Sequence, residues 1–242
     1  MLFADVIRTI RPFLNHLLPA TCVLCGYTAT NNLCQACQRS LPILSQHCPR
    51  CAKFLTFQQT QSIPLLCGAC QQHPPPFDHT FALFPYEFPI IQLITALKFQ
   101  QKLSHGNALS KQFITNIEQL WYLNKPLPDL ILPVPLHPKR LQERGFNQAL
   151  EIAKPIARYF DLPIDTKGLQ RTYHTAAQSG LSAEERKRNV LHAFTATRRF
   201  DGLTIALIDD VVTTGQTVIA CCEKLKSNGA KSIHVWCAAR RG

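Results

Sequence analysis

The sequence lacks any long, uninterrupted apolar run. Its first twenty residues are apolar in places, but Asp5, Arg8 and Arg11 interrupt them at helical spacing. This pattern predicts an amphipathic helix over residues 1–20 and not the apolar region of a secretion signal. The uncharged stretch 54–77 is rich in Gln, Pro and Cys, which hydrocarbon would not accept. We therefore expect no membrane span and a cytoplasmic location.

Acidic residues are also scarce. The chain of 242 residues holds 15 Asp and Glu against 26 Lys and Arg, which gives a formal net charge of +11. Residues 1–77 contain a single acid and five basic residues. This imbalance favours polyanionic partners, nucleic acid among them. The sequence has no internal repeat beyond its cysteine pairs and no low-complexity segment.

Large apolar residues are few between Leu33 and Pro76, so this segment cannot bury much core by itself. It is instead rich in cysteine, in four C-x-x-C pairs. Two such pairs can place four thiolates around one Zn²⁺ in a closed, structural site, so eight thiols predict two zinc ions in a double zinc-ribbon domain over residues 21–76. The predicted ligands are Cys22, Cys25, Cys34, Cys37, Cys48, Cys51, Cys67 and Cys70.

Two alternatives compete with zinc. A disulfide framework fits secreted proteins, whereas cytosolic thiols stay reduced, and an iron–sulfur cluster is a minor possibility. The pairing stays open. The pair 22/25 can share an ion with 34/37 along the sequence, or with 48/51 in an interleaved arrangement.

Three consecutive prolines, Pro74–Pro76, predict a linker to a second domain over residues 77–242. In this domain, strand-like and helix-like segments alternate, which predicts an α/β fold with a parallel sheet covered by helices on both faces. Cys221, Cys222 and Cys237 fall inside these segments without C-x-x-C spacing, so we expect buried structural thiols. The expected strands are 80–86, 130–134, 203–208 and 232–238, and the expected helices are 90–98, 108–120, 149–159 and 218–227.

The most informative segment follows the strand 203–208, where two acids and two valines lead into Thr-Thr-Gly-Gln-Thr. Hydroxyl groups, a glycine and the free N–H groups of a helix start favour a bound phosphate. Adjacent carboxylates repel phosphate but suit the 2′- and 3′-hydroxyls of a ribose, with or without Mg²⁺. This order of residues predicts a site for phosphoribosyl pyrophosphate (PRPP) in a strand-to-helix loop. The candidate residues are Asp209, Asp210, Thr213, Thr214, Gly215, Gln216 and Thr217.

With these motifs the chain resembles the type I phosphoribosyltransferases, and over nearly its whole length the competence protein F (ComF) family. The resemblance implies a phosphoribosyltransferase-like domain behind a zinc domain. It also implies that the basic segment after the strand 130–134 forms a loop for the pyrophosphate of PRPP, with Arg144–Gln148 as a family signature. The residues expected there are Lys139, Arg140, Arg144 and Gly145.

A further segment, 171–189, corresponds to the flexible loop that closes over PRPP in such enzymes. Gln178, Arg186 and Asn189 match the family's pattern, and Ser182 with Glu185 has capping-box spacing for a short helix from Ala183.

The resemblance implies a role in natural transformation, in the uptake or handling of single-stranded DNA, with a DNA-uptake helicase or other competence proteins as partners. DNA would contact the basic zinc ribbon through phosphate attraction and stacking on Phe54, Phe57 and His47. Four further arginines, Arg198, Arg199, Arg240 and Arg241, are expected outside the PRPP site.

Two function classes stay open: a transferase that displaces pyrophosphate from PRPP, and a module that binds PRPP without chemistry. In relatives that act on 6-oxopurines an acid precedes the Thr-Gly of the loop. Here that position is Thr213, and no aromatic hood for a base is evident, which argues against ordinary purine salvage.

Overall fold

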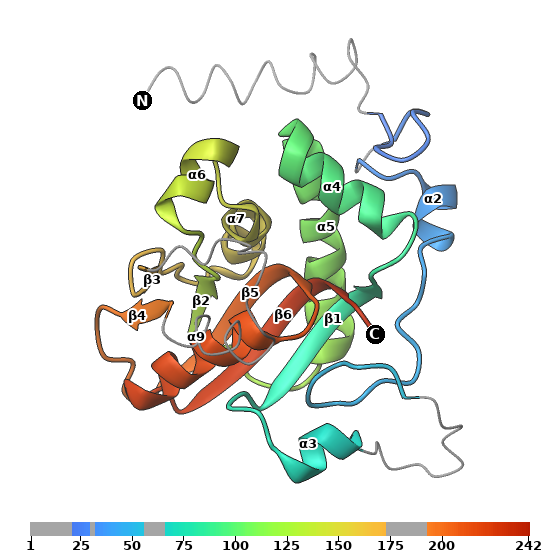
Figure 1. The fold of residues 1–242 in the computed structure, drawn as a ribbon. Coiled ribbons are helices and arrows are strands. Elements are labelled where there is room, and N and C mark those ends of the chain that lie inside the picture. The colour runs from blue at the N-terminus through green and yellow to red at the C-terminus, as the bar shows by residue number, and fades with distance from the viewer. Residues whose placement is uncertain (1–20, 30–31, 56–65, 173–192) are drawn as a thin grey trace, which may run out of the picture. The chain divides into compact units, whose positions relative to one another are not determined.

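The computed structural model describes residues 21–29, 32–55, 66–172 and 193–242, in two compact units that divide between Leu41 and Pro42 (Figure 1). The predicted helix at 1–20 lies outside the described residues, as do Gln178, Arg186, Asn189 and the short helix expected from Ala183. The second group of cysteines belongs to the same unit as the sheet. The domain boundary at residues 76 and 77 stays a prediction.

The first unit contains little regular structure. Its helix α2 spans Gln35–Arg39, and Thr21 and Thr28 form an isolated antiparallel bridge. Its buried apolar residues among those described are Cys22, Ala29, Leu33 and Leu41. So small a core agrees with the expectation that bound metal stabilises this region.

The second unit is built on a four-stranded sheet in the order β1-β6-β5-β2, with every pair parallel. Parallel strands covered on both faces are apolar throughout, and Ile205–Ile208 at the centre of β5 are fully buried. The predicted fold class is therefore confirmed. The strands are β1 His79–Pro85, β2 Leu130–Pro133, β5 Thr204–Val212 and β6 Ser232–Arg240.

Helices cover the two faces of this sheet. Figure 1 shows α9 in front of the sheet and α5 and α7 behind it. Cys221 and Cys222 of α9 and Cys237 of β6 are fully buried, which confirms them as structural thiols. The helices are α3 Gly68–Gln72, α4 Ile90–Gln100, α5 Leu103–Asn116 with the π-helical turn η1 Ile117–Trp121, α6 Pro138–Arg144, α7 Gln148–Phe160 and α9 Gln216–Ser227.

The structure corrects three sequence-based expectations. First, the expected loop after residue 208 begins later, because β5 continues to Val212 and pairs with β6 up to Arg240. Asp209 and Asp210 therefore lie in a strand.

Second, the expected pyrophosphate loop contains the helix α6. His137 caps its start by accepting a hydrogen bond from the Lys139 N–H, and Pro138 occupies its first turn. Gly145 ends it in the left-handed region, at φ 77°.

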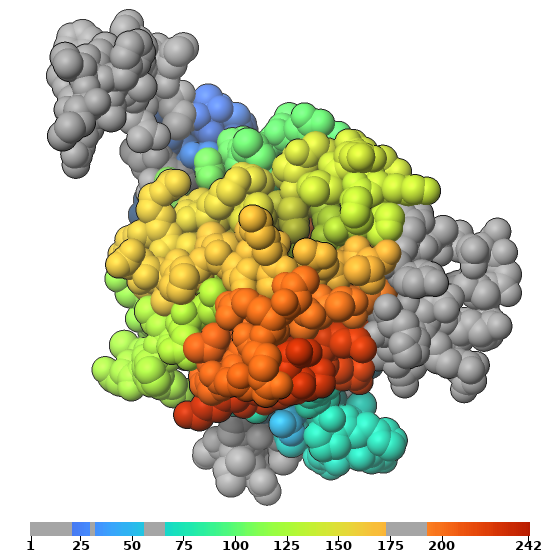
Figure 2. Space-filling model, turned by 90° about the vertical axis from the view of Figure 1, so that its left-hand side faces the viewer, coloured from blue at the N-terminus to red at the C-terminus, as the bar shows by residue number. Residues whose placement is uncertain are grey.

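Third, two short antiparallel strands were not anticipated, β3 (Leu169–Arg171) and β4 (Phe194–Ala196). In Figure 2 the segment around β4 (orange) lies directly beside the segment that leads into β3 (gold). Strands of three residues carry too little alternation to be read from sequence.

Candidate functional site

The first cysteine cluster gathers Cys22, Cys25, Cys34 and Cys37, whose sulfur atoms lie within 4.8 Å of one another. The Sγ atoms of Cys25 and Cys34 are 3.6 Å apart, far beyond the bond length of a disulfide. Tetrahedral zinc with Zn–S bonds of about 2.3 Å separates its sulfur ligands by roughly this distance. The geometry fits a metal site and not a disulfide.

The second cluster gathers Cys48, Cys51, Cys67 and Cys70 in the same way, with 3.6 Å between the Sγ atoms of Cys51 and Cys67. Burial raises the pKa of Cys48, but N–H groups of Cys67, Cys51 and Arg50 lower it further, to about 7. The backbone thus favours the thiolate form of Cys48, whereas burial raises the pKa values of Cys51 and Cys70. The two clusters follow the sequential pairing, 22/25 with 34/37 and 48/51 with 67/70.

The acidic pair lies near the carboxyl end of β5. Asp210 is buried and its Oδ2 lies 2.9 Å from the Nζ of Lys98, on α4. Asp209, half-buried, accepts a hydrogen bond from the Asp210 N–H at 2.8 Å. Successive residues of a strand point to opposite faces, so a ligand that engages both acids must approach from the end of the strand.

Electrostatics distinguish the two acids. Burial and the neighbouring Asp210 carboxylate raise the pKa of Asp209 to about 7, against the partial compensation of Lys98 and Arg171. Near neutral pH the pair therefore changes its charge readily, as groups that bind a cation or a polar ligand often do.

The segment 213–217 forms the turn between β5 and α9. Thr213 and Thr214 are exposed, and Gly215 caps the helix with φ 81°, a left-handed conformation that favours glycine. The first N–H groups of α9 have no partner within the helix, and they make its start a suitable place for an anion. Gln216 contributes a buried Oε1 for which the described structure provides no hydrogen-bond donor.

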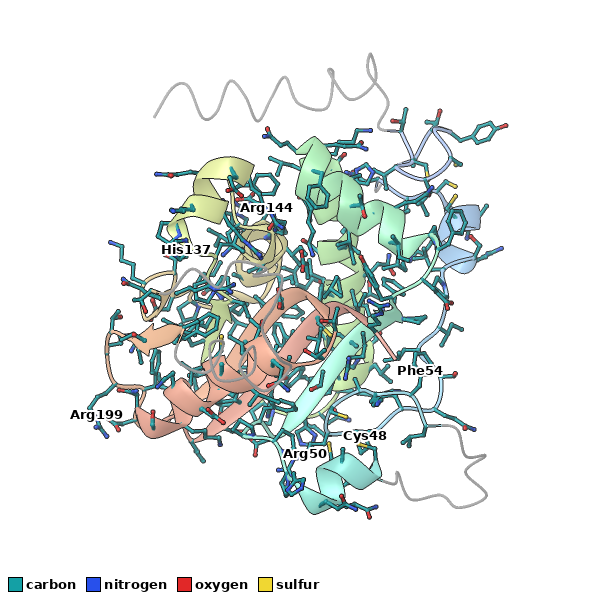
Figure 3. The ribbon with its side chains drawn as sticks, in the orientation of Figure 1. Cys48, Arg50, Phe54, His137, Arg144 and Arg199 are labelled. Atoms are coloured by element: carbon teal, nitrogen blue, oxygen red, sulfur yellow. The ribbon has the colours of Figure 1, made fainter. Side chains whose placement is uncertain are left out.

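The basic residues of α6 lie near α4. Arg140 and Arg144 line one hollow together with Lys98, Phe99, Gln101 and Glu143. Arg144 stacks over the Phe99 ring at 5.6 Å and donates to Gln148 at 2.9 Å. The other end of that amide, Gln148 Nε2, is buried without an acceptor in the described structure. Figure 3 shows Arg144 and His137 at the same end of the molecule, far from Arg199.

Sequence reasoning missed Lys98 and misplaced Arg240. Lys98 belongs to α4, more than a hundred residues before Asp210, and no local motif marks it. Arg240, expected outside the site, is buried and donates to the Val212 and Thr213 carbonyls at the start of the predicted phosphate loop. Of the other arginines, Arg198 pairs with Asp165 and Arg199 with Asp201.

None of the helices in the described parts of the chain is long and apolar enough to cross a membrane.

The chain is similar to known proteins over most of its length. Residues 13–72 match the family model of the double zinc ribbon domain, and residues 147–242 that of the phosphoribosyl transferase domain. DNA utilization protein YhgH of Escherichia coli strain K12 is 34% identical over 227 residues, 92% of this chain and 98% of that protein. Competence protein F of Haemophilus influenzae is 30% identical over 226 residues, 90% of this chain and 96% of that protein.

Solved structures with similar folds include adenine phosphoribosyltransferase from Leishmania tarentolae, at 12% identity and a TM-score of 0.39, which covers 67% of this chain and 91% of that one. Purine phosphoribosyltransferase from Pyrococcus horikoshii matches with a TM-score of 0.34 at 15% identity, over 66% of this chain and 78% of that one.

Metal analysis tests the two clusters. We expect about two zinc ions per chain in protein purified under reducing conditions, four thiolates for each ion. If Cys22, Cys25, Cys34 and Cys37 are all replaced with Ser, one zinc should remain, because the second cluster is complete by itself. Interleaved sites would lose both ions in this variant, and metal-free protein with disulfides would overturn the zinc assignment.

Asp209 should make stability depend on pH. Its folded-state pKa, about 7, lies above the ordinary value of 3.8, so between these values the folded protein binds more protons than the unfolded chain. Stability must then fall as pH rises from about 4 to 7, and the loss is complete above 7. Asp209→Asn should remove this component, and Glu223→Gln, an exposed change on α9, should not. Urea unfolding at several pH values measures the difference between wild type and variant. A difference that does not change with pH would contradict the assignment.

Proposed function

We propose that this chain, which belongs to the competence protein F family, binds PRPP with Mg²⁺ at the carboxyl end of β5 and acts on single-stranded DNA in natural transformation. The cytoplasm is the proposed place of action. The observation that carries the PRPP proposal is the convergence of an acidic pair, a helix start with an exposed Thr-Thr-Gly turn, and basic side chains of α4 and α6.

The 5′-phosphate would bind at the turn 213–217. Thr213, Thr214 and Thr217 supply hydroxyl groups, and Gly215 leaves room for the phosphate to approach the backbone. The buried Oε1 of Gln216 supports a ligand nearby, since a buried acceptor without a donor costs about 1–3 kcal/mol and a bound hydroxyl or water would satisfy it.

The ribose would bind through Asp209 and Asp210. In the free protein Lys98 neutralises part of this acidic pair, at 2.9 Å from Asp210. Carboxylate oxygens are also the ligands that Mg²⁺ prefers, and the ion would bridge the pair to the ligand. Binding of Mg²⁺ requires ionised carboxylates, so the raised pKa of Asp209 favours tighter binding above neutral pH.

The pyrophosphate would bind beside α6. Arg140 and Arg144 line the hollow next to Lys98, Lys139 is exposed on the same helix, and Gly145 ends it. Gln148, with its unsatisfied buried Nε2, follows in the next helix. Planar guanidinium groups suit a ligand with several anionic oxygens. Three further residues expected to contribute lie outside the described part of the chain, namely Gln178, Arg186 and Asn189.

An active phosphoribosyltransferase with an unknown acceptor is the second candidate function. The exposed Thr213 occupies the position from which an acid would assist a purine, so a different nucleophile would be needed. Pyrophosphate release from PRPP, measured with and without single-stranded DNA, separates the two candidates, because a binding module would release none.

Removal of both acids tests the PRPP site. Asp209→Ala with Asp210→Ala should abolish Mg²⁺-dependent PRPP binding in calorimetry, because the groups for the ribose hydroxyls and Mg²⁺ are gone. Glu223→Ala is the matched control, an exposed acid on α9 that should leave affinity unchanged. Unchanged affinity in a folded double variant would sink the assignment.

Binding of single-stranded DNA can be tested with charge-reversal variants and by its dependence on salt concentration. Sequence alone suggests Arg50 and Lys53 as contacts, but Arg50 donates to the Phe77 carbonyl at 3.2 Å, so its reversal would also disturb the fold. Lys53 and Arg39 are exposed and better suited. Lys53→Glu and Arg39→Glu should weaken binding to all sequences alike, and Lys167→Glu, an exposed lysine ahead of β3, should weaken it less.

For the wild type, fluorescence anisotropy should show that the logarithm of the association constant falls linearly with the logarithm of the salt concentration. Each neutralised phosphate should contribute about −0.7 to the slope. An affinity that does not depend on salt concentration would reject the DNA role and favour the transferase. So would a failure to bind strands tens of nucleotides long at low salt.

A further inference from the structure

Arg240, the last residue of β6, connects two regions that chain order keeps apart. Its side chain is buried at the end of the sheet, with 6% of the residue exposed. Nε donates to the Cys51 carbonyl at 2.9 Å, and Nη1 donates to the Val212 carbonyl at 3.0 Å and to the Thr213 carbonyl. One guanidinium thus holds the backbone of a cysteine of the second cluster and the start of the predicted phosphate turn.

A buried guanidinium requires satisfied donors, because an unpaired charge away from water is costly. Here backbone carbonyls satisfy it, including that of Arg241 at 2.5 Å, and no carboxylate of the described residues lies within 4.0 Å of it. Its bonds therefore depend on where these backbone segments lie. Displacement of either segment leaves part of a buried cation unsatisfied.

The two regions also border a shared hollow. A hollow of about 620 Å³ lies between them, lined by Cys51, Cys67 and Cys70 on one side and by Thr213, Thr214 and Gly215 on the other, with Arg240 in its wall. Arg240 thus adds a polar link between two segments that also meet in the hydrophobic core, through Ala52 and Val212. Figure 3 shows the cluster side of this region, with Cys48 and Arg50 close together near α3.

The cluster side is itself anchored in the core. Ala52, directly after Cys51, is fully buried in the main hydrophobic core, and Arg50 donates to the carbonyl of Phe77, also a core residue. Metal bound to Cys48, Cys51, Cys67 and Cys70 would fix the backbone of Cys51, and with it the carbonyl that Arg240 requires.

We propose that Arg240 is a positioning residue that couples metal binding at the second cysteine cluster to ligand affinity at the turn 213–217. The inference rests on the proposed PRPP site and deepens it. With metal present, the guanidinium holds Val212 and Thr213 so that the N–H and hydroxyl groups of the turn face the phosphate. Loss of the metal releases the Cys51 carbonyl and loosens the turn. Coupling of this kind is reciprocal in binding free energy, so PRPP must also raise the affinity of this cluster for metal.

The first arm of the test needs no ligand. Arg240→Gln removes the charge and most of the donors, and Arg241→Gln is the matched control, since Arg241 is exposed and binds Val212 only through its backbone N–H. In an equilibrium competition with a chromogenic chelator, Arg240→Gln should hold one of its two zinc ions with about fivefold or more lower affinity than the wild type. Arg241→Gln should hold zinc like the wild type.

The second arm adds PRPP with Mg²⁺. In calorimetry Arg240→Gln should bind PRPP about fivefold or more weakly than Arg241→Gln. In the same competition, PRPP should raise the affinity for one zinc in the wild type and fail to do so in Arg240→Gln. Cys67→Ser alone should weaken PRPP binding. When it is combined with Arg240→Gln, it should weaken binding little further, because the effects of coupled changes are not additive. If Arg240→Gln does not fold, as judged by the absence of cooperative unfolding, Arg240→Lys takes its place in both arms. Lysine keeps the positive charge but loses the donor geometry of the guanidinium.

The outcomes are distinguishable. No PRPP binding by the wild type would reject the proposed function and this inference with it. Normal wild-type binding, with equal affinities for zinc and for PRPP in the variants of Arg240 and Arg241, would reject the inference alone. So would a rise in zinc affinity with PRPP that persists without Arg240.

Discussion

The parallel pairing of β5 with β6 is the constraint on which the candidate site depends. Its register runs from Thr204 opposite Ser232 to Val212 opposite Arg240, and it is fixed by residues buried on both faces of the two strands. A slip of one residue would turn every side chain to the opposite face. The acidic pair would then leave Lys98, and the guanidinium of Arg240 would leave the turn that follows β5. The arrangement of charges at this end of the sheet is therefore a consequence of how apolar side chains pack at its centre.

Much of this architecture follows from sequence. The four sheet strands and the helices α4, α5, α7 and α9 were all predicted, within two residues at each end except for the end of β5 and the extent of α5, because apolar periodicity and burial agree there. The length of β5 could not be predicted, since Asp209 and Asp210 look like the end of a strand until their pairing with β6 is known. The helix α6 has no apolar period and is defined by its caps. Lys98 reaches the site only through the tertiary fold, which no single-sequence pattern encodes.

The cysteine clusters differ in what surrounds them. The first lies in a unit with a handful of buried apolar residues among those described, so bound metal would be the main stabiliser of the part of this unit that the structure describes. The second shares Ala52 and Phe77 with the core of the sheet and has a buried arginine bound to one of its carbonyls. Metal at the first cluster would thus be a condition for local folding. Metal at the second would act on a framework that packing already supports.

The three buried cysteines of the sheet domain have a chemical consequence. Burial raises the pKa of Cys221, Cys222 and Cys237, so these thiols stay protonated and unreactive while the protein is folded. The eleven cysteines in the chain therefore divide into three that burial in the sheet domain protects and eight that bound metal would shield. Alkylation of Cys221, Cys222 or Cys237 consequently reports unfolding of the sheet domain, separately from any labelling of the cluster cysteines.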